Sequence, residues 1–226
     1  MMVFENDDKA ILLEFYLNEG KLSFTTEDEH TDRANRLMHY VRAMSGIEIW
    51  GLLKEHRSEF CDITTKNIPQ FSDIQSIDKV LNIVESSVDG KLAYRNIGYF
   101  FNKDASEGAQ HKYGENHYKL ASSIGLVTVE KPYSVTPLYY AYLLSERTQK
   151  KEIIAKLLLN IPIIQKILIE SEKSSYNVPD LLYQYLSKST ARRRGSSIKQ
   201  VINSICDIMP ETERAIIKNN IEWRYE

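Results

Sequence analysis

A chain of 226 residues with 42% hydrophobic content is long enough to bury one large core or two to three small ones. No apolar run reaches membrane-spanning length, and Met1 and Met2 lead into the acidic stretch 5–8, so we expect a cytoplasmic protein. Cys61 and Cys206 have neither the spacing of metal ligands nor the density of a disulfide-bonded scaffold, which favours reduced thiols.

The small net charge of −2 hides a division along the chain. Residues 1–75 contain 8 lysines and arginines against 14 aspartates and glutamates, whereas residues 76–226 contain 21 against 17. The later part is therefore basic, and it includes three consecutive arginines, Arg192 to Arg194. The overall balance does not mark a nucleic-acid-binding protein, but this distribution places any anion-binding surface in the later part of the chain.

Residues 1–72 predict a small, acidic domain that is mainly helical. The expected elements are a helix over 9–17 ended by Gly20, a strand over 21–25, a helix over about 26–44, a helix or strand over 47–54, and a linker over 56–70 with one strand at 60–64. The second helix has an apolar face that should be buried, made of Ala34, Leu37, Met38 and Val41.

Residues 73–149 have the element order of a winged helix, in which three helices precede a two-stranded hairpin. The expected elements are a helix over 76–85 closed by Gly90, helices over 93–101 and about 110–124, a strand over 125–130, a turn at Lys131 and Pro132, a strand over 133–136, and a helix that begins at Pro137 behind Thr136. The side chains expected in the core are Ile77, Val80, Leu81, Val84, Ile97, Phe100, Phe101, Leu120, Ala121 and Ile124.

Residues 150–226 repeat this order in part. The expected elements are an apolar stretch over 152–159, a helix from Pro162 with Ile163, Ile164, Ile167 and Leu168 inward, a short helix over 179–186, the arginine-bearing helix, and a helix over 211–220. No hairpin is evident after the arginine-bearing helix. We therefore expect a helix-turn-helix unit whose wing is absent or replaced.

The stretch from Ser187 to Ile205 is the most distinctive part of the chain. Its second half has one apolar stripe at helical spacing, made of Ile198, Val201, Ile202 and Ile205. With Ser189 or Thr190 as N-cap, three arginines lie at the helix start, where the helix dipole favours acids. Phosphate is the external partner that fits such a site, and a solvated basic turn is the alternative. Because consecutive helical residues are about 100° apart, at most two arginines should face DNA, preferably Arg192 and Arg193.

Four motifs together resemble a known family: residues 97–101 (Ile-Gly-Tyr-Phe-Phe), 113–127 (Tyr-Gly-Glu-Asn-His to Gly-Leu-Val), 133–138 (Tyr-Ser-Val-Thr-Pro-Leu) and 189–198 (Ser-Thr-Ala-Arg-Arg-Arg-Gly-Ser-Ser-Ile). They look like the paired winged-helix modules that recognise DNA in certain type II restriction endonucleases and related bacterial defence proteins. The resemblance covers about residues 73–208. The acidic N-terminal region resembles no family that we can name.

By this resemblance, the residues that contact DNA lie at the start of each third helix and in the first hairpin. The first unit would contribute Lys112, Asn116, His117, Lys119 and, from the hairpin tip, Lys131. The second unit would contribute Thr190, Arg192, Arg193, Ser196 and Lys199. Asparagine can pair with adenine through two hydrogen bonds, and lysine and arginine bind phosphates. The alternative for each residue is a polar, solvent-exposed helix face.

A second hypothesis is a small type II endonuclease that hydrolyses DNA with Mg²⁺. Such an enzyme needs an acid followed by an acid-X-Lys motif on adjacent strands, so that carboxylates hold the metal beside the lysine. The weak candidates are Glu14, Glu19, Lys21, Asp62 and Lys66, with Asp8 as another upstream acid. Short motifs of this kind arise often by chance, and a largely helical region leaves little room for a central sheet. We therefore assign no metal site from the sequence.

The sequence thus predicts a mainly α protein with two winged-helix or helix-turn-helix units, one β-hairpin wing and a small helical (α+β) N-terminal domain. The leading functional hypothesis is sequence-specific binding of double-stranded DNA in a restriction or related defence system. Under this hypothesis, the protein forms a homodimer or binds a partner nuclease subunit, and it does not contact a membrane. The third hypothesis is a regulatory subunit that uses the same scaffold to bind protein rather than DNA.

Overall fold

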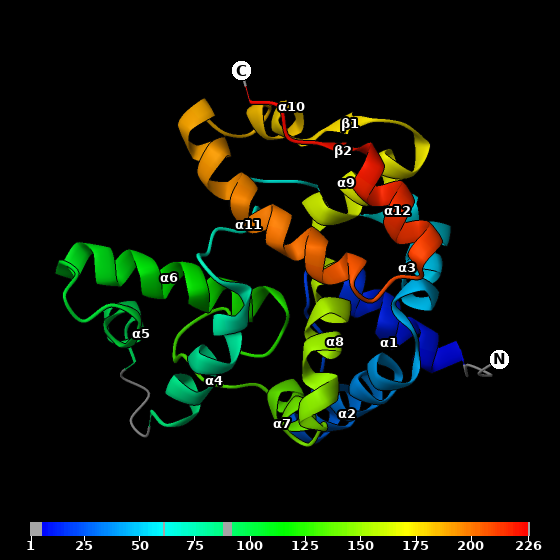
Figure 1. The fold of residues 1–226 in the computed structure, drawn as a ribbon. Helices are drawn as coiled ribbons and strands as arrows, with labels where there is room; N and C mark the ends of the chain where they lie inside the picture. The colour runs from blue at the N-terminus through cyan, green and yellow to red at the C-terminus, as the bar shows by residue number, and fades with distance from the viewer. Residues whose placement is uncertain (1–5, 61, 88–91, 226) are drawn as a thin grey trace.

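The computed structural model describes residues 6–60, 62–87 and 92–225, which form a mainly helical protein (Figure 1). The α-helices are α1 (Asn6–Leu17), α2 (Glu27–Ala43), α3 (Gly46–Glu55), α4 (Ile77–Glu85), α5 (Tyr94–Phe101), α6 (Glu107–Ser123), α7 (Pro137–Leu143), α8 (Arg147–Leu157), α9 (Pro162–Lys173), α10 (Val178–Tyr183), α11 (Lys188–Cys206) and α12 (Glu211–Asn220). The 3-10 helices are η1 (Arg57–Glu59), η2 (Ile74–Ser76) and η3 (Leu158–Asn160). Two short strands, β1 (Tyr176–Asn177) and β2 (Ile221–Glu222), pair in parallel. Within these residues, none of the helices is both long and apolar enough to cross a membrane.

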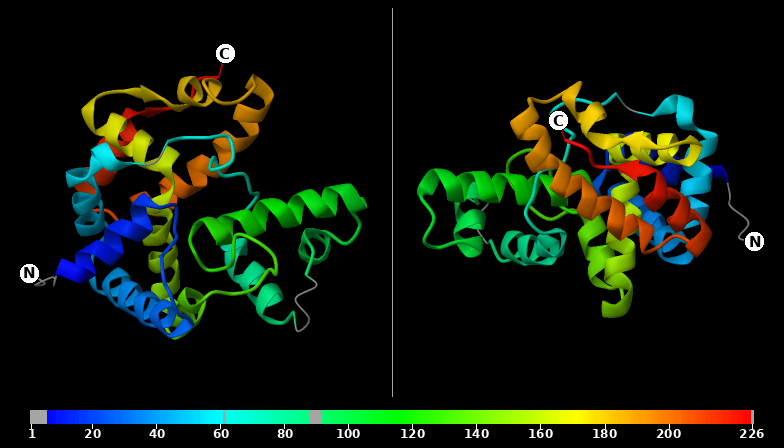
Figure 2. Two further views of the ribbon diagram at one scale, coloured as in Figure 1. Left: turned by 180° about the vertical axis from the view of Figure 1, so that it is seen from behind. Right: turned by 45° about the horizontal axis from the view of Figure 1, so that its top comes forward.

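The helices form a body with a smaller group at its side. α4, α5 and α6 project to one side in Figure 1, and the view from behind in Figure 2 shows the same separation from α1 and α12. α7 and α8 then pack against α2. One continuous core nevertheless runs from Ile11 to Ile217 and includes Val80 of α4 and Tyr118 of α6. The predicted boundary between residues 149 and 150 falls inside α8, since that helix begins at Arg147.

The amphipathic helices bury the faces that their spacing predicts. The confirmed buried residues are Ala34, Leu37, Met38 and Val41 of α2, Ile77, Val80, Leu81 and Val84 of α4, Leu120, Ala121 and Ile124 at the end of α6, Ile163, Ile164, Ile167 and Leu168 of α9, and Ile198, Val201, Ile202 and Ile205 of α11. The ambiguous stretch 47–54 is helical, and a capping box of Ser45 and Glu48 begins it. The helix over 211–220 has its predicted bounds. The predictions that concern Cys61 and Gly90 lie outside the described residues.

The two strands expected in the N-terminal region do not form. In residues 21–25, the N–H and Oγ of Ser23 donate to the Glu14 carboxylate, so a side chain satisfies the backbone donor that a neighbouring strand would have bound. Residues 62–64 also form no strand, and the Thr64 N–H donates to Asn67 Oδ1 at 2.9 Å. In both segments, hydrogen bonds from the backbone to nearby side chains take the place of the expected strand pairing.

The predicted hairpin is present in a reduced form. Its backbone hydrogen bonds join the Thr128 N–H to Ser134 at 2.9 Å and the Thr136 N–H to Leu126 at 3.1 Å, around a single antiparallel bridge between Val127 and Val135. The paired region is therefore shorter than the two strands expected over 125–130 and 133–136. α7 starts directly after it with proline in the first turn, as predicted.

Two local predictions in the helices are wrong. Phe100 is 53% exposed rather than inward, because Ile97 and Gly98 occupy the side of α5 that faces α6. α11 begins at Lys188 with Ser187 as N-cap, rather than at Ser189 or Thr190, and the Ser187 hydroxyl donates to Thr190 Oγ1 at 3.0 Å. The arginines therefore lie in the second turn of α11 rather than the first.

α5 and α6 touch through their backbones at two glycines. A Cβ atom at Gly98 would collide with the carbonyl group of Gln110, and a Cβ at Gly114 would collide with that of Tyr94. Any larger residue at either position would force the helices apart, because packed backbone cannot yield as a flexible side chain can. This contact fixes the position of α6 relative to α5.

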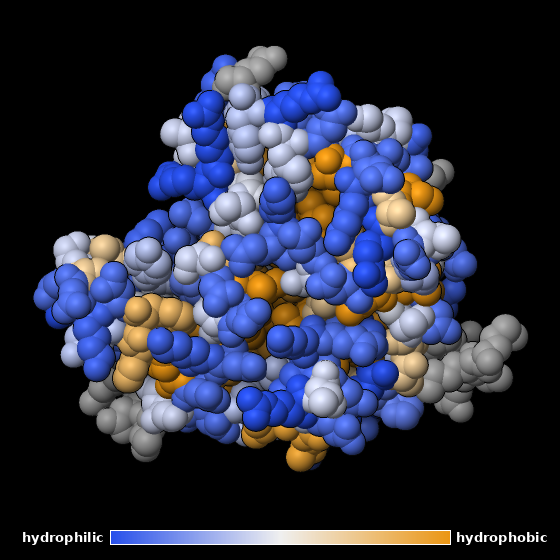
Figure 3. Space-filling model, viewed as in Figure 1, coloured by the Kyte–Doolittle hydropathy of each residue, from blue (hydrophilic) through white to orange (hydrophobic). Residues whose placement is uncertain are grey.

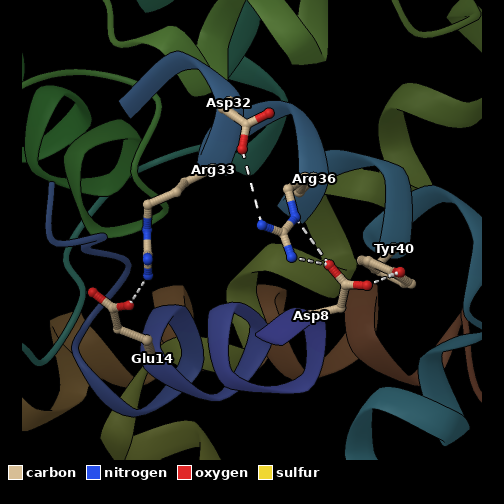
Figure 4. A network of polar contacts seen from close by, with 6 residues as sticks. All are labelled: Asp8, Glu14, Asp32, Arg33, Arg36 and Tyr40. Carbon is tan, nitrogen blue, oxygen red and sulfur yellow. Dashed lines mark hydrogen bonds and ion pairs between the residues drawn. The ribbon is translucent and has the colours of Figure 1, made fainter. Parts of the chain in front are cut away.

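Ion pairs join α1 to α2 (Figure 4). The Asp8 carboxylate, 7% exposed, accepts hydrogen bonds from the Arg36 guanidinium at 2.6 Å and from the Tyr40 hydroxyl. Glu14 pairs with Arg33 in the same interface. The hydrogen bonds from Tyr40 and Arg36 hold the pKa of Asp8 below its ordinary value. Part of the negative charge of the N-terminal region is thus neutralised within the fold.

Gly114→Ala should lower the free energy of unfolding by about 1–3 kcal/mol or more, because its methyl group has no room beside the Tyr94 carbonyl. Gly108→Ala is the matched control on the same helix, since no atom lies within 4 Å of a Cβ built there. That control should be neutral or stabilising, by up to about 1 kcal/mol. Urea unfolding followed by circular dichroism measures both, and equal stabilities would show that the helices do not touch at Gly114.

Asp8→Asn should reduce stability by about 1–3 kcal/mol at neutral pH, because it removes the charge that Arg36 and Tyr40 bind. Since folding lowers the pKa of Asp8, its contribution is complete above the ordinary pKa of an aspartate and is lost as the pH falls through the lower pKa of the folded state. The difference between wild type and variant should therefore shrink in acid. Asp7→Asn, at the exposed neighbouring position, should leave the wild-type acid profile unchanged. A difference for Asp8→Asn that stays constant with pH would contradict this account.

Candidate nucleic-acid interface

A polar stripe on α11 binds the backbone of residues 65–74. Arg194 Nη1 donates to two carbonyl oxygens at the start of this segment, at 2.6 and 2.9 Å. The buried Ser197 hydroxyl accepts from the Phe71 N–H at 2.9 Å and donates to the Phe71 carbonyl at 2.8 Å. Gln200 binds one N–H and one carbonyl group near the end of the segment. These side chains recur every three residues, so they share one helix face and bind successive parts of this segment.

His117 joins the other side of this segment to α6. Its Nδ1 lies 2.8 Å from the Tyr113 carbonyl oxygen, which only accepts, so Nδ1 carries the proton and Nε2 accepts from Ser72 Oγ at 3.0 Å. The ring stacks on Phe101 at 4.4 Å, and burial lowers the pKa of His117. His117 is 1% exposed and both its nitrogens are engaged. The sequence-based prediction that His117 contacts DNA is therefore wrong. The overlooked signal was its spacing from the core residue Ala121, one turn along the helix.

A hollow of about 220 Å³ separates α6 from residues 65–70. Its charged lining consists of Lys66, Lys112, Lys119 and Arg194, and within the described part of the chain no carboxylate joins it. Asn116 and Ser123 lie on the same α6 stripe as the two lysines of that helix. Three other hollows, of about 760, 560 and 340 Å³, each include an aspartate in their lining. The structure thus brings Lys112, Asn116 and Lys119 together with Arg194 around a basic, acid-free hollow.

Glu115 holds the two lysines of α6 in place beside this hollow. Its carboxylate accepts from Lys112 Nζ at 2.7 Å and from Lys119 Nζ at 2.6 Å, and these two hydrogen bonds lower the pKa of Glu115 to about 2. Each ammonium group has three N–H donors, so both lysines keep donors for an external anion. The lysine side chains are 62% and 58% exposed, which leaves them accessible to a polyanion.

The outer face of α11 is cationic, and α11 contains no acidic residue. Arg192, Arg193, Ser196 and Lys199 are exposed and Thr190 is half-buried, whereas Arg194 is turned toward residues 65–70. Burial lowers the pKa of Arg194. Arg192 and Arg193 are therefore exposed and Arg194 is not, and the expectation that the first two face DNA stays a prediction.

The C-terminal segment packs on part of this face. The Arg192 guanidinium lies 6.0 Å from the ring centre of Tyr225, and Lys199 Nζ lies 5.8 Å from that of Trp223. Arg193 Nη2 donates to Thr190 Oγ1 at 3.4 Å and is directed along the helix. Aromatic rings of the C-terminal segment thus lie beside two of the cations of α11.

Lys131 lies apart from the basic hollow. It is exposed at the tip of the hairpin, and its Nζ is 5.8 Å from the ring centre of Tyr133. It does not line the hollow.

The candidate nuclease residues are only partly brought together. Glu14 is bound by Arg33 and Ser23, away from any motif on paired strands. Asn67 Nδ2 donates to Glu19 Oε1 at 3.3 Å and to the backbone oxygen of Asp62 at 3.1 Å, which joins these two segments. Lys66 lines the basic hollow and Lys21 is exposed in the turn after α1. Within the described ranges, no three acidic, histidine or cysteine side chains gather as a metal site would require.

Residues 65–70 are the part of the candidate interface that the sequence did not reveal, because they lie in the stretch 56–70 that the sequence predicts as a linker. Pro69 offered one signal, since it restricts Ile68 to an extended conformation. A second signal was the spacing of three polar residues of α11 beside its apolar stripe: Arg194, Ser197 and Gln200.

Comparisons with protein-family models, with curated proteins and with solved structures found no match to this chain. The resemblance to winged-helix modules of restriction endonucleases therefore depends on the sequence motifs alone. The DNA contacts that this resemblance implies remain predictions.

Proposed function

We propose that this protein binds double-stranded DNA through α6, residues 65–70 and the outer face of α11. The observation that carries the proposal is the basic hollow, where Lys66, Lys112, Lys119 and Arg194 converge from three separate parts of the chain. The one carboxylate bound to these lysines is that of Glu115, so the cations remain in excess. Clustered cations around a concave surface attract the regularly spaced phosphates of a nucleic acid. The net charge of −2 does not oppose this, because residues 76–226 contain 21 lysines and arginines against 17 aspartates and glutamates.

α6 is the helix that we propose to enter the major groove. It lies at the outer edge of the molecule with its first turns directed away from the body (Figure 1). Asn116 is half-buried in the middle of its polar stripe, between Lys112 and Lys119. An asparagine flanked by phosphate-binding lysines is suited to contact a base edge while the lysines set the register. Lys131 at the hairpin tip and Arg193 on α11 would contact the backbone on either side.

The biological setting follows from the sequence motifs. We propose that the chain is the recognition part of a restriction or related defence system in the cytoplasm, built from winged-helix-like units. DNA cleavage would then come from a partner nuclease subunit, and a homodimer would allow a palindromic site to be bound.

Lys112→Ala combined with Lys119→Ala should weaken binding to all duplex sequences alike. The slope of log affinity against log salt should become shallower by about 0.9 for each phosphate contact removed. The matched control is Lys166→Ala combined with Lys173→Ala, because these exposed lysines also share one glutamate, Glu170, but lie on α9 outside the hollow. Fluorescence anisotropy with a mixed-sequence duplex over a series of salt concentrations measures the slopes.

The two pairs of variants distinguish the outcomes. An unchanged slope for the α6 pair, or equal losses for both pairs, would rule out the hollow as a phosphate-binding surface.

The same protein incubated with plasmid and Mg²⁺ tests the alternative, since discrete fragments would identify an endonuclease. No binding and no cleavage would favour the protein-interaction hypothesis.

Asn116→Ala should relax the preference for one base pair rather than weaken binding in general. The loss should be about 1–3 kcal/mol against the best site, selected from a random duplex library, and little against random DNA. If affinity for both falls equally, Asn116 contacts the phosphate backbone. Thermal unfolding of the variant provides the control, because Asn116 is half-buried beside the core residue Leu120.

A further inference from the structure

The basic hollow beside α6 holds more positive charge than one DNA phosphate can balance. Four cations line it, namely Lys66, Lys112, Lys119 and Arg194. Glu115 is the one carboxylate that binds any of them within the described ranges, so a surplus of three positive charges remains. Duplex DNA spreads its negative charges along the outside of the helix, at about one per 1.7 Å of axis. A single phosphodiester at the hollow therefore leaves most of this surplus unbalanced.

The hollow has the size of a small anion. Its volume of about 220 Å³ is the smallest of the four hollows described above. A water molecule takes about 30 Å³ of the liquid, so this space holds about seven oxygen-sized atoms, as many as pyrophosphate contains. α6, residues 65–70, Arg194 of α11 and Ile161 before α9 each supply part of the lining. A duplex can present only its outer phosphates to such a space, whereas a compact anion can enter it.

Buried apolar side chains strengthen the attraction of these cations for an anion. Ile68, Leu120 and Ile161 line the hollow and are only 2–3% exposed. Low-dielectric walls reduce screening by water, so a cleft with one sign of charge concentrates counter-ions. The amides of Gln70 and Asn116 add uncharged hydrogen-bond donors. In the view of Figure 3, the surface between α6 and the first half of α11 is mostly hydrophilic, whereas hydrophobic side chains show near the centre of the molecule.

Contacts within the chain position the walls of the hollow. The backbone contact at Gly114 holds α6 against α5. Arg194 Nη1 donates to two carbonyl oxygens of the opposite wall, at 2.6 and 2.9 Å, and an arginine has five N–H donors, so others remain for a ligand. Asn67 in the same wall donates to Glu19 Oε1 at 3.3 Å, and Glu19 itself does not line the hollow. The fold thus sets the distance between the two walls.

We propose that the basic hollow binds a compact diphosphate group, either free pyrophosphate or the diphosphate of a nucleotide, and that this ligand excludes DNA. Pyrophosphate carries about three negative charges at neutral pH, which equals the surplus of the hollow. Because no carboxylate among the described residues lines the hollow, the cations bind the phosphate oxygens directly rather than through a metal ion. The inference rests on the proposed function only in that both use this hollow, since diphosphate binding needs no duplex.

Isothermal titration calorimetry of the full chain at one ionic strength tests the proposal, with pyrophosphate, adenosine diphosphate, orthophosphate and sulfate as ligands. Pyrophosphate should bind one-to-one and at least about tenfold more tightly than orthophosphate or sulfate, because it balances the whole surplus. Mg²⁺ should weaken this binding, since it neutralises the ligand. Tighter binding of pyrophosphate than of adenosine diphosphate identifies the free ion as the ligand, and the reverse order identifies a nucleotide.

Asn116→Asp places a carboxylate in the hollow with almost no change in shape. It should weaken pyrophosphate binding at least about tenfold. Lys66→Ala, at an exposed position outside the helices, should also weaken it and provides a second variant if the first is unstable. Asn96→Asp is the matched control, because Asn96 is exposed on α5 outside the hollow. Its Oδ1 accepts from the Ala93 N–H at 3.1 Å, as a carboxylate also can, so this variant should bind pyrophosphate as wild type does.

Several results would overturn the proposal. They are the absence of saturable pyrophosphate binding, an affinity no higher than that for sulfate, tighter binding in the presence of Mg²⁺, or equal effects of Asn116→Asp and Asn96→Asp.

Competition separates this inference from the DNA-binding proposal. In fluorescence anisotropy, pyrophosphate should release a bound duplex at concentrations where sulfate of equal ionic strength does not. Duplex affinity that is unchanged when pyrophosphate is bound would contradict the shared site. Duplex binding without pyrophosphate binding would refute this inference alone, whereas pyrophosphate binding without duplex binding would refute DNA binding alone.

Discussion

The attachment of residues 65–74 to α11 is the interaction on which the arrangement of this protein depends. This segment buries Ile68 and Phe71 outside any helix or strand, so the backbone groups there need side-chain partners, and the only sheet in the described residues is the two-residue pairing of β1 and β2. Arg194, Ser197 and Gln200 supply those partners. Because the same segment contacts His117 through Ser72, it holds α6 and α11 at a set separation and leaves the basic hollow between them.

The attachment of residues 65–74 to α11 also shows that the three consecutive arginines need not have one role. Arg194 binds carbonyl groups and is partly desolvated, whereas Arg192 and Arg193 remain exposed on other faces of the helix. A helix rotates by about 100° per residue, so a run of three like residues necessarily meets different surroundings. Charged side chains also contribute to packing in residues 1–75, since Asp8 and Glu14 bind arginines of α2 and join that helix to α1.

The sequence predicted the helices well and the connections poorly. Helical periodicity is a local signal, and the buried faces of α2, α4, α9 and α11 followed from it directly. The expected strands over 21–25 and 60–64 failed because strand formation needs a neighbour, and Ser23 and Thr64 found side-chain acceptors instead. The pairing of Tyr176 with Ile221 joins residues far apart in the chain through strands too short to show alternation. For the site, Lys112, Asn116 and Lys119 were identified from one polar helix face, but Lys66 and Arg194 joined them only through tertiary structure.

The glycine contact between α5 and α6 also limits how this protein can change shape. Two helices in backbone contact at both Gly98 and Gly114 cannot roll or slide against each other without a collision between main-chain atoms, so the pair has the degrees of freedom of one rigid body. The distance between Lys112 and α11 therefore depends on the contacts of this pair with the rest of the molecule, such as the hydrogen bond between Ser72 and His117. The spacing of polar groups along α6 stays constant.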